Sequence, residues 1–176
     1  MRTVLVTGGV RSGKSTHAER LLADEEAVVY VAPGPSPDVE QDPDWAARID
    51  LHRSRRPAHW RTVEGHDLTP ALGDGAAVLV DCLGTWLTSV VDDARAWEWR
   101  SEELHDLVLT RLELVLAGAR SHTGRLVWVT NEVGLGVVPE HRSGRVFRDL
   151  LGLVNQRVAA ECDEVHLVVA GRVLVL

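Results

Sequence analysis

The lysine at position 14 is the only one in the chain, and it lies in the segment Gly8-Gly9-Val10-Arg11-Ser12-Gly13-Lys14-Ser15. This segment fits G-x-x-x-x-G-K-[ST], the pattern of a loop that binds nucleotide phosphates. Arginine is used at every other strongly basic position, so the single ammonium marks a place where a compact point charge suits the task better than a planar guanidinium. We therefore predict that residues 8–15 bind a nucleotide. A chance glycine turn in front of a helix is the alternative.

The residues on either side of this segment have the order that a phosphate-binding loop needs. Thr3–Thr7 is a short β-branched and aliphatic run that ends at Gly8, and Ser15–Leu22 has the pattern of a helix. Glycines at positions 8 and 13 let backbone N–H groups turn toward the phosphates, and the helix N-terminus adds partial positive charge. We expect the Ser15 hydroxyl to ligate Mg²⁺.

Asp81 is the candidate for a second Mg²⁺ group. It closes the apolar run Val78-Leu79-Val80, and phosphate-loop proteins hold an acidic residue at the end of such a strand to organise Mg²⁺ and its waters. A simple strand-ending cap is the alternative.

His52 is the candidate nucleophile. It is surrounded in sequence by four arginines, Arg48, Arg53, Arg55 and Arg56. Neighbouring positive charge favours a neutral imidazole, which is the form that attacks phosphorus, and the guanidiniums supply charge to bind a polyphosphate. A solvated arginine-rich turn is the simpler alternative.

The proline-rich segment Pro33–Pro43 cannot form a regular element, because its prolines fix φ and remove donors. It leaves a predicted strand at the carboxyl end, the edge where parallel sheets bind ligands. Ala32, Pro33 and Gly34 are therefore candidates to line a nucleotide crevice. A mobile surface connection is equally compatible with the pattern.

A second loop, Asn131–Pro139, leaves another predicted strand at the same edge, and Gly134 and Gly136 permit close backbone approach to a ligand. Asn131 and Glu132 can position an acceptor hydroxyl or its Mg²⁺, whereas a hinge without ligand contact is the alternative. Three arginines follow at helical spacing, for which an anionic substrate, another subunit or, more simply, solvent is the expected partner: Arg142, Arg145 and Arg148.

These residues need a scaffold in which strands alternate with helices. Continuous apolar runs predict strands over 27–32, 76–81, 126–130 and 165–169, besides the first strand and a strand over 60–64. Helical patterns cover 102–120 and 142–162, and Asp42-Pro43 starts a further helix. The alternation predicts an α/β fold with a mostly parallel sheet flanked by helices, and Gly171 turns the last strand into a C-terminal β-hairpin with Arg172–Leu176.

The composition predicts one globular domain over residues 1–176. The net charge of −7, with arginines scattered among acids, argues against nucleic acid as the main partner. No run approaches the roughly 20 apolar residues of a membrane span, and no signal-peptide pattern opens the chain, so we expect a cytosolic protein. Cys82 and Cys162 have no metal spacing and are expected to be buried, reduced thiols.

Several segments together resemble a known family. They are the phosphate loop, Arg48–His52, Arg56–Glu64, Asn131–Pro139, Val154–Arg157 and Ala170-Gly171. The chain resembles, from end to end, the bifunctional adenosylcobinamide kinase/adenosylcobinamide-phosphate guanylyltransferases of cobalamin biosynthesis. The phosphate loop is shared by many families, whereas the Asn-Glu-Val-Gly run and the R-I-x-x-H segment are far more specific.

The resemblance implies a RecA-like P-loop fold and a two-step enzyme. ATP or GTP phosphorylates adenosylcobinamide; His52 then takes GMP from GTP, and the cobinamide phosphate displaces it to give adenosylcobinamide-GDP. Lys14, Asp81 and Mg²⁺ serve the phosphates, and relatives suggest a homo-oligomer, a trimer. The implied nucleotide contacts are residues 8–15, Ala32, Pro33, Gly34, Arg53, Ser54, Arg55, Arg56, Glu64 and Asp81.

Glu64 has a chemical reason to select guanine. Its carboxylate can accept hydrogen bonds from guanine N1–H and the exocyclic amine, a combination that adenine cannot offer. A solvated strand-end carboxylate is the alternative. Two other functions remain open from the residues: a RecA-like regulatory NTP-binding subunit, and a kinase for another alcohol.

Overall fold

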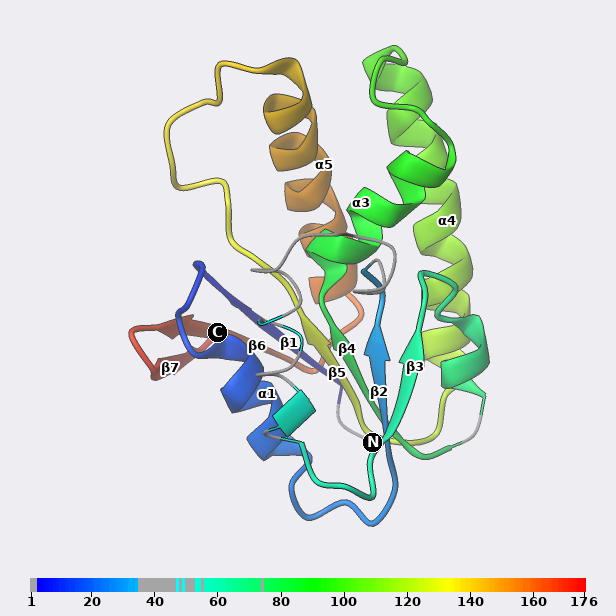
Figure 1. Cartoon of the computed structure of the whole chain (residues 1–176), viewed down its shortest axis with the longest axis vertical. Coiled ribbons are helices and arrows are strands. Elements are labelled where there is room, and N and C mark those ends of the chain that lie inside the picture. Colours follow the sequence, from blue (N-terminus) through cyan, green and yellow to red (C-terminus); the bar gives the residue numbers. More distant parts are fainter. Residues whose placement is uncertain (1–2, 35–46, 48, 50–52, 55, 74) are drawn as a thin grey trace.

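Seven strands form one sheet in the order β3-β2-β4-β5-β1-β6-β7 in a computed structural model of the chain, which describes residues 3–34, 47, 49, 53, 54, 56–73 and 75–176 (Figure 1). Neighbouring strands are parallel except β6 and β7, which form an antiparallel hairpin. The strands are β1 Thr3–Gly8, β2 Val28–Ala32, β3 Arg61–Glu64, β4 Ala77–Asp81, β5 Leu126–Val129, β6 Glu164–Val169 and β7 Arg172–Val175.

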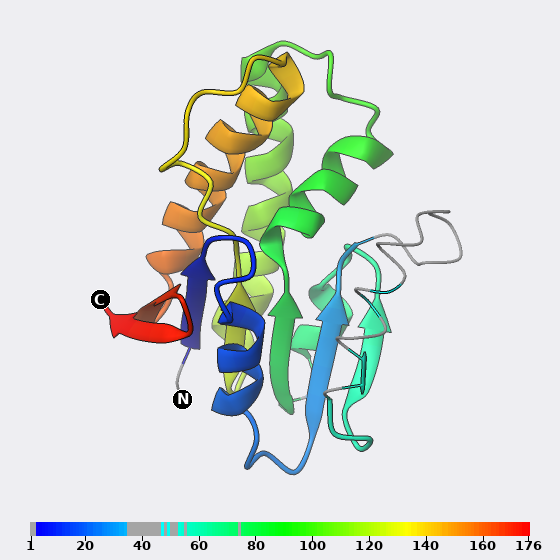
Figure 2. The same cartoon turned by 60° about the vertical axis from the view of Figure 1, so that its left-hand side comes forward.

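Helices cover both faces of the sheet. Helix α1 (Lys14–Leu21) lies on one face, while α3 (Leu83–Asp93), α4 (Ser101–Ser121) and α5 (Arg142–Ala159) pack on the other (Figure 2). A short 3-10 helix, η1 (Thr69–Leu72), packs against α4. The mostly parallel sheet with flanking helices and a C-terminal hairpin confirms the predicted fold class.

The central strands have no polar alternation because both of their faces are buried. On β1, Val4 and Val6 pack with α1, whereas Leu5 packs in the larger cluster on the opposite face, and all three are at most 2% exposed. Successive side chains of a strand point to opposite faces, so a two-sided sheet requires a continuous apolar run. This pattern is the one from which the strands were predicted.

Helix α3 is the element that the sequence pattern did not indicate. It begins after Cys82, where the Thr85 hydroxyl accepts a hydrogen bond from the Cys82 N–H at 3.3 Å and donates to the Cys82 carbonyl at 2.8 Å. Its buried residues include Trp86, Leu87 and Val90, which have the i, i+1, i+4 spacing of one helical face. The predicted helix start at Asp42-Pro43 lies outside the described residues.

The two cysteines are free, as expected, but each is only partly buried and not fully buried as predicted. Burial raises the pKa of the Cys82 thiol, and the neighbouring Asp81 carboxylate adds to the effect. Among the described residues, no helix combines the length and apolarity needed to cross a bilayer.

Candidate active site

The phosphate loop runs from the end of β1 into α1, and its glycines are required by geometry. A Cβ on Gly8 would lie 2.3 Å from the Val168 carbonyl oxygen and 2.8 Å from Ser12 Oγ. Gly13 has a φ of 96° and precedes the first turn of α1 without supplying a side-chain cap. The helix N-terminus therefore keeps the positive backbone potential that favours an anion.

The turn of the C-terminal hairpin packs against this loop. The Gly171 N–H, at the β6–β7 turn, donates to the Ser12 carbonyl at 2.8 Å, and a Cβ on Gly13 would lie 3.5 Å from Gly171 Cα. The sequence indicated only a turn at Gly171. Its contact with the phosphate loop joins residues at opposite ends of the chain.

Lys14 is the first residue of α1 and is only 6% exposed. Its Nζ donates to the Gly9 carbonyl at 3.2 Å, so the ammonium lies over the loop to which it belongs. A buried ammonium beside backbone carbonyls and a helix N-terminus is suited to holding nucleotide phosphates.

Asp81 ends β4, which is separated from β1 by β5 alone. Its carboxylate accepts a hydrogen bond from the Tyr30 hydroxyl, with 3.2 Å between Oδ2 and the phenolic oxygen. Tyr30 belongs to the apolar cluster on the α1 face, so this contact directs the Asp81 carboxylate toward the face that carries the phosphate loop. Ser15, the second residue of α1, lies on that face as well.

The arginines that follow position 52 contact the β2–β3 side of the sheet. Arg53 Nη2 donates to Glu64 Oε1 at 2.7 Å, and both side chains are nearly half exposed. The guanidinium of Arg56 lies 3.7 Å from the centroid of the Tyr30 ring and donates through Nη1 to Thr62 Oγ1 at 3.0 Å. His52 itself, with Arg48 and Arg55, lies outside the described residues.

Residues at the end of β2 contact both faces of the sheet. Ala32 pairs in register with Glu64 and packs in the cluster on the α1 face. The Pro33 carbonyl accepts a hydrogen bond from Ser89 of α3 at 2.8 Å, so that oxygen is engaged on the opposite face. Gly34 is described and partly buried, whereas the rest of the predicted loop through Pro43 is not described.

The connection between β5 and α5 lies directly beside the phosphate loop, as both cartoon views show (Figures 1 and 2). The Glu132 N–H donates to the Gly8 carbonyl at 3.1 Å, and the Asn155 amide of α5 donates to the Asn131 carbonyl at 3.1 Å. Glu132 Oε1 accepts from the Gly134 N–H at 2.6 Å. Beyond these contacts, Leu135 and Val137 are 90% and 95% exposed.

The arginines of α5 hold backbone carbonyls, which corrects the expectation of a simply solvated face. Arg142 Nη2 donates to the Trp99 carbonyl at 2.5 Å, and its Nη1 donates to the Trp97 carbonyl. Arg145 donates to the carbonyls of Pro139 and Glu140, and Arg148 donates to that of Gly134. Irregular backbone needs such partners because its carbonyls have no sheet or helix neighbour.

A hydrogen-bonded chain beside α1 had no signal in the sequence. His17 Nε2 lies 2.8 Å from His166 Nδ1, and His166 Nε2 lies 2.8 Å from Glu164 Oε2. Burial, the His166 ring and Arg20, in that order, lower the pKa of His17. His17 is one turn beyond Lys14, so the chain ties the phosphate-loop helix to β6.

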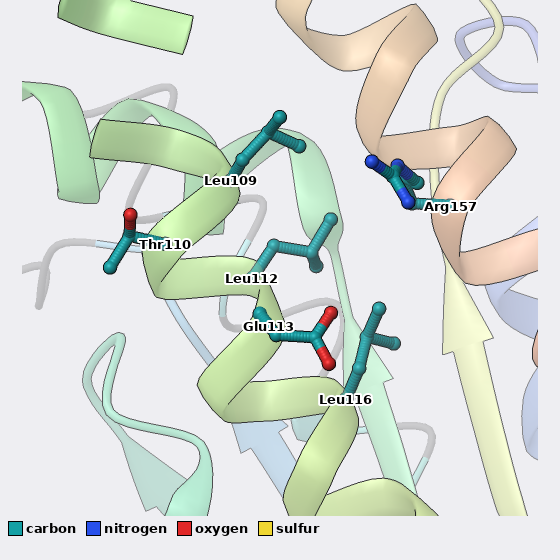
Figure 3. A pocket seen from close by; sticks show the side chains of 6 residues that line it. All are labelled: Leu109, Thr110, Leu112, Glu113, Leu116 and Arg157. Atoms are coloured by element: carbon teal, nitrogen blue, oxygen red, sulfur yellow. The ribbon is translucent and has the colours of Figure 1, made fainter. Parts of the chain in front are cut away.

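A hollow of about 300 Å³ lies away from the phosphate loop, between α4 and α5 on the opposite face of the sheet (Figure 3). Glu113 of α4 and Arg157 of α5 border it. Glu113 Oε1 already accepts from Arg120 at 2.6 Å. None of the predicted site residues lines this hollow.

Comparison with known proteins places the chain in one family. The family described as "Cobinamide kinase / cobinamide phosphate guanyltransferase" matches residues 4–176. The chain belongs to this family. Among curated relatives, it is 41% identical to the "Bifunctional adenosylcobalamin biosynthesis protein CobU" of Salmonella typhimurium LT2, with 96% of each chain covered. It is 38% identical to the Pseudomonas aeruginosa protein CobP, with 95% of this chain and 92% of the relative covered.

Among solved structures, an ATPase of a bacterial type III secretion system superposes with a TM-score of 0.56 at 8% identity, over 94% of this chain. The chain spans 51% of that ATPase, and the likeness concerns the fold alone, which is of the RecA-like P-loop type. The family match decides among the three functional hypotheses. The protein is an enzyme, a cobinamide kinase and cobinamide-phosphate guanylyltransferase, as predicted.

Proposed function

We propose that one catalytic domain carries out both reactions, with its nucleotides held on the α1 face and His52 as the carrier of GMP. The supporting observation is that three elements lie on this one face of the sheet. They are the phosphate loop with its buried lysine, the Asp81 carboxylate, and the arginines that directly follow position 52. All seven described strands belong to one sheet, which favours a single domain over residues 1–176.

In the kinase reaction, the terminal hydroxyl of adenosylcobinamide attacks the γ-phosphorus of ATP or GTP. The bond between the γ-phosphorus and its bridging oxygen breaks, the hydroxyl proton leaves to a base or solvent, and cobinamide phosphate and a nucleoside diphosphate result. Lys14 and the backbone N–H groups of residues 8–15 hold the β- and γ-phosphates, so charge on the leaving diphosphate is balanced by groups already in position.

In the guanylyltransferase reaction, a neutral nitrogen of His52 attacks the α-phosphorus of GTP. A phosphorus–nitrogen bond forms, the α–β phosphoanhydride bond breaks, and pyrophosphate leaves. An oxygen of cobinamide phosphate then attacks the same phosphorus, breaks the phosphorus–nitrogen bond and returns the imidazole. Two displacements replace one direct reaction between two anions, and Arg53, Arg55 and Arg56 reduce the repulsion.

The residues present suit Mg²⁺. The carboxylate of Asp81 and the hydroxyl of Ser15 are oxygen donors on the same face of the sheet, and Mg²⁺ prefers such ligands together with water and substrate phosphates. The ion would offset the negative charge of the nucleotide phosphates. Asp81 would hold it in part through water.

Glu64 is proposed to read the guanine base, beside Ala32, Pro33, Gly34 and Ser54. Glu64 ends β3 in register with Ala32 at the end of β2, so its carboxylate is at the strand edge where the base of a bound nucleotide can lie. Arg53 donates a hydrogen bond to one of the Glu64 oxygens. A bound guanine would either share the Glu64 carboxylate with the Arg53 guanidinium or displace it.

The chain is also proposed to work as a homo-oligomer in the cytosol, where ATP and GTP are available; a trimer is the resemblance-based expectation. The edge strand β7 supports self-association because Val173, Leu174 and Val175 are 41–56% exposed on a strand whose outer edge has no described neighbour. Light scattering during gel filtration gives the number of subunits. A monomer at micromolar concentration would contradict the oligomer.

Labelling with α-³²P-GTP tests the nucleotidyl relay. Protein incubated with this GTP and Mg²⁺ should acquire acid-labile, base-stable label, which cobinamide phosphate then removes. His52→Ala should abolish the label while the kinase activity remains. His59→Ala is the matched control, because His59 is an exposed histidine in the same region. Unchanged labelling of His52→Ala would refute His52 as the carrier.

A further inference from the structure

Tyr30 lies at the centre of β2 and is 3% exposed. It is the only tyrosine in the chain. Its ring packs among the apolar residues of the α1 face, and its hydroxyl donates to Asp81 Oδ2 on the neighbouring strand β4. A phenol in such a position buries its ring while its polar tip reaches one defined acceptor.

The same ring carries a second contact. The Arg56 guanidinium is 3.7 Å from the ring centroid, within the range of a cation–π interaction, and a bond to Thr62 on β3 orients it further. Tyr30 is therefore between the strand-end carboxylate and the arginine segment that follows position 52. Three segments distant in sequence meet at one side chain.

We propose that Tyr30 is a positioning residue for both half-reactions: its hydroxyl orients the Asp81 carboxylate toward the phosphate site, and its ring holds Arg56 beside the GMP-transfer site. This inference rests on the proposed roles of Asp81 and of the arginine segment. It adds a residue that touches neither nucleotide nor acceptor and acts through two groups that do.

The chemistry of the hydroxyl suits this role. A phenol O–H donates a single hydrogen bond, and its acceptor here is Asp81 Oδ2 at 3.2 Å. A hydrogen bond to a carboxylate fixes its orientation, and hydrogen bonds of this kind commonly orient the carboxylates that hold metal ions.

Two substitutions separate the two contacts. Tyr30→Phe removes the hydroxyl and keeps the ring under Arg56, whereas Tyr30→Leu removes both. Thr62→Val removes only the second anchor of Arg56. Val28→Ala is the packing control. Val28 is a buried residue of β2 in the same cluster, and its side chain has no group that could form a hydrogen bond with Asp81 or Arg56. Asp81→Asn measures how much the Mg²⁺ dependence changes when the carboxylate itself is lost.

For Tyr30→Phe we expect an about tenfold higher Mg²⁺ concentration for half-maximal activity in both reactions, with nucleotide KM changed less than kcat. A readout independent of turnover is the rise in Tm caused by GTP: the extra rise produced by Mg²⁺ should shrink in Tyr30→Phe and remain in Val28→Ala. Tyr30→Leu should additionally slow formation of the guanylylated protein by about tenfold. Thr62→Val should slow it by a smaller factor.

The outcomes are separable. If Tyr30→Phe keeps the Mg²⁺ dependence of wild type while Asp81→Asn changes it, the inference is wrong and the proposed function stands. If Asp81→Asn also leaves the Mg²⁺ dependence unchanged, the proposed role of Asp81 fails first. If Val28→Ala reproduces every effect of Tyr30→Phe, Tyr30 serves packing alone and the inference is overturned.

Discussion

Arg53 and Glu64 form an ion pair, with 2.7 Å between Nη2 and Oε1, at the edge of the sheet where the guanine base is proposed to lie. Both side chains are more than two-fifths exposed, so the pair itself adds little to the free energy of folding. We propose that the pair matters for function, because Arg53 belongs to the arginine segment of the proposed GMP-transfer site and Glu64 to the proposed base site.

Glu64→Gln should therefore lower the preference for guanine with little effect on stability. The amide keeps one acceptor oxygen but presents an N–H₂ to guanine donors, so we expect the KM for GTP in guanylylation to rise about tenfold. ATP-dependent cobinamide phosphorylation should stay within twofold, as should the Tm within a few degrees. Glu98→Gln, a change at an exposed carboxylate elsewhere, is the control. An unaltered GTP KM would remove Glu64 from base recognition.

Gly8→Ala should disrupt the phosphate loop. The new methyl would overlap the Val168 carbonyl, so β6 or the loop must shift, at an expected loss of about 1–3 kcal/mol in the free energy of unfolding. Nucleotide binding, measured calorimetrically, should weaken strongly. Gly152→Ala is the matched change, because a Cβ there meets nothing within 4 Å and α5 gains a better helix former. Equal Tm values for the two variants would contradict the steric argument.

Lys14→Arg should fail as a conservative substitution. The lysine side chain is only 6% exposed, and a planar guanidinium is too wide for a space that holds a compact ammonium. We expect both reactions to fall by about 100-fold, while circular dichroism shows an intact fold. Lys14→Met sets the baseline for complete loss of charge. Retention of a tenth or more of wild-type activity by the arginine variant would show that charge alone suffices.

The burial of His17 should make the free energy of unfolding fall as the pH falls. Because the pKa of His17 is lowered in the folded state, the unfolded chain binds its proton first as the pH falls through about 6.5. The contribution is present above that pH and is lost progressively toward the lower, folded-state pKa. Urea unfolding at pH 7.5 and 5.5 should show a smaller pH effect for His17→Gln than for wild type. An equal or larger effect in the variant would contradict this assignment.

The exposed apolar side chains of the β5–α5 connection should act on the corrinoid acceptor and not on the nucleotide. Leu135 and Val137 extend into solvent from this connection, which contacts the phosphate loop through the Glu132 N–H. Arg145 and Arg148 bind backbone carbonyls of the same connection, at Glu140 and Gly134. Replacing both by serine should raise the KM for cobinamide about fivefold and leave the KM for ATP unchanged. The reverse pattern would point to a nucleotide contact.

The phosphate loop was predictable because its determinants are local. Two glycines, one lysine and one serine at fixed spacing, between an apolar run and a helix, suffice to specify a strand–loop–helix unit. The strands were predictable for a similar reason, since burial on both faces requires an unbroken apolar run. Helix α3 escaped prediction, although the i, i+1, i+4 spacing of Trp86, Leu87 and Val90 was the signal that could have found it.

The arginines of α5 show where local pattern fails. Their spacing is that of an ordinary solvated face, yet each donates to carbonyls of connections that precede the helix. No property of residues 142–148 specifies which irregular backbone will pass within reach. That depends on how the α3–α4 and β5–α5 connections pass beside this helix.

Sequence alone therefore determined the order of the strands, the helices α1, α4 and α5, the phosphate-binding unit and, through specific motifs, the family. Tertiary structure decided which distant residues share a site: the strand order brings Tyr30 beside Asp81, docking of the arginine segment places Arg56 over the same ring, and the C-terminal turn supports Ser12. The physical reason is that dihedral preferences and hydrophobic periodicity act over a few residues. Hydrogen bonds between side chains of different segments exist only once the sheet has set their distance.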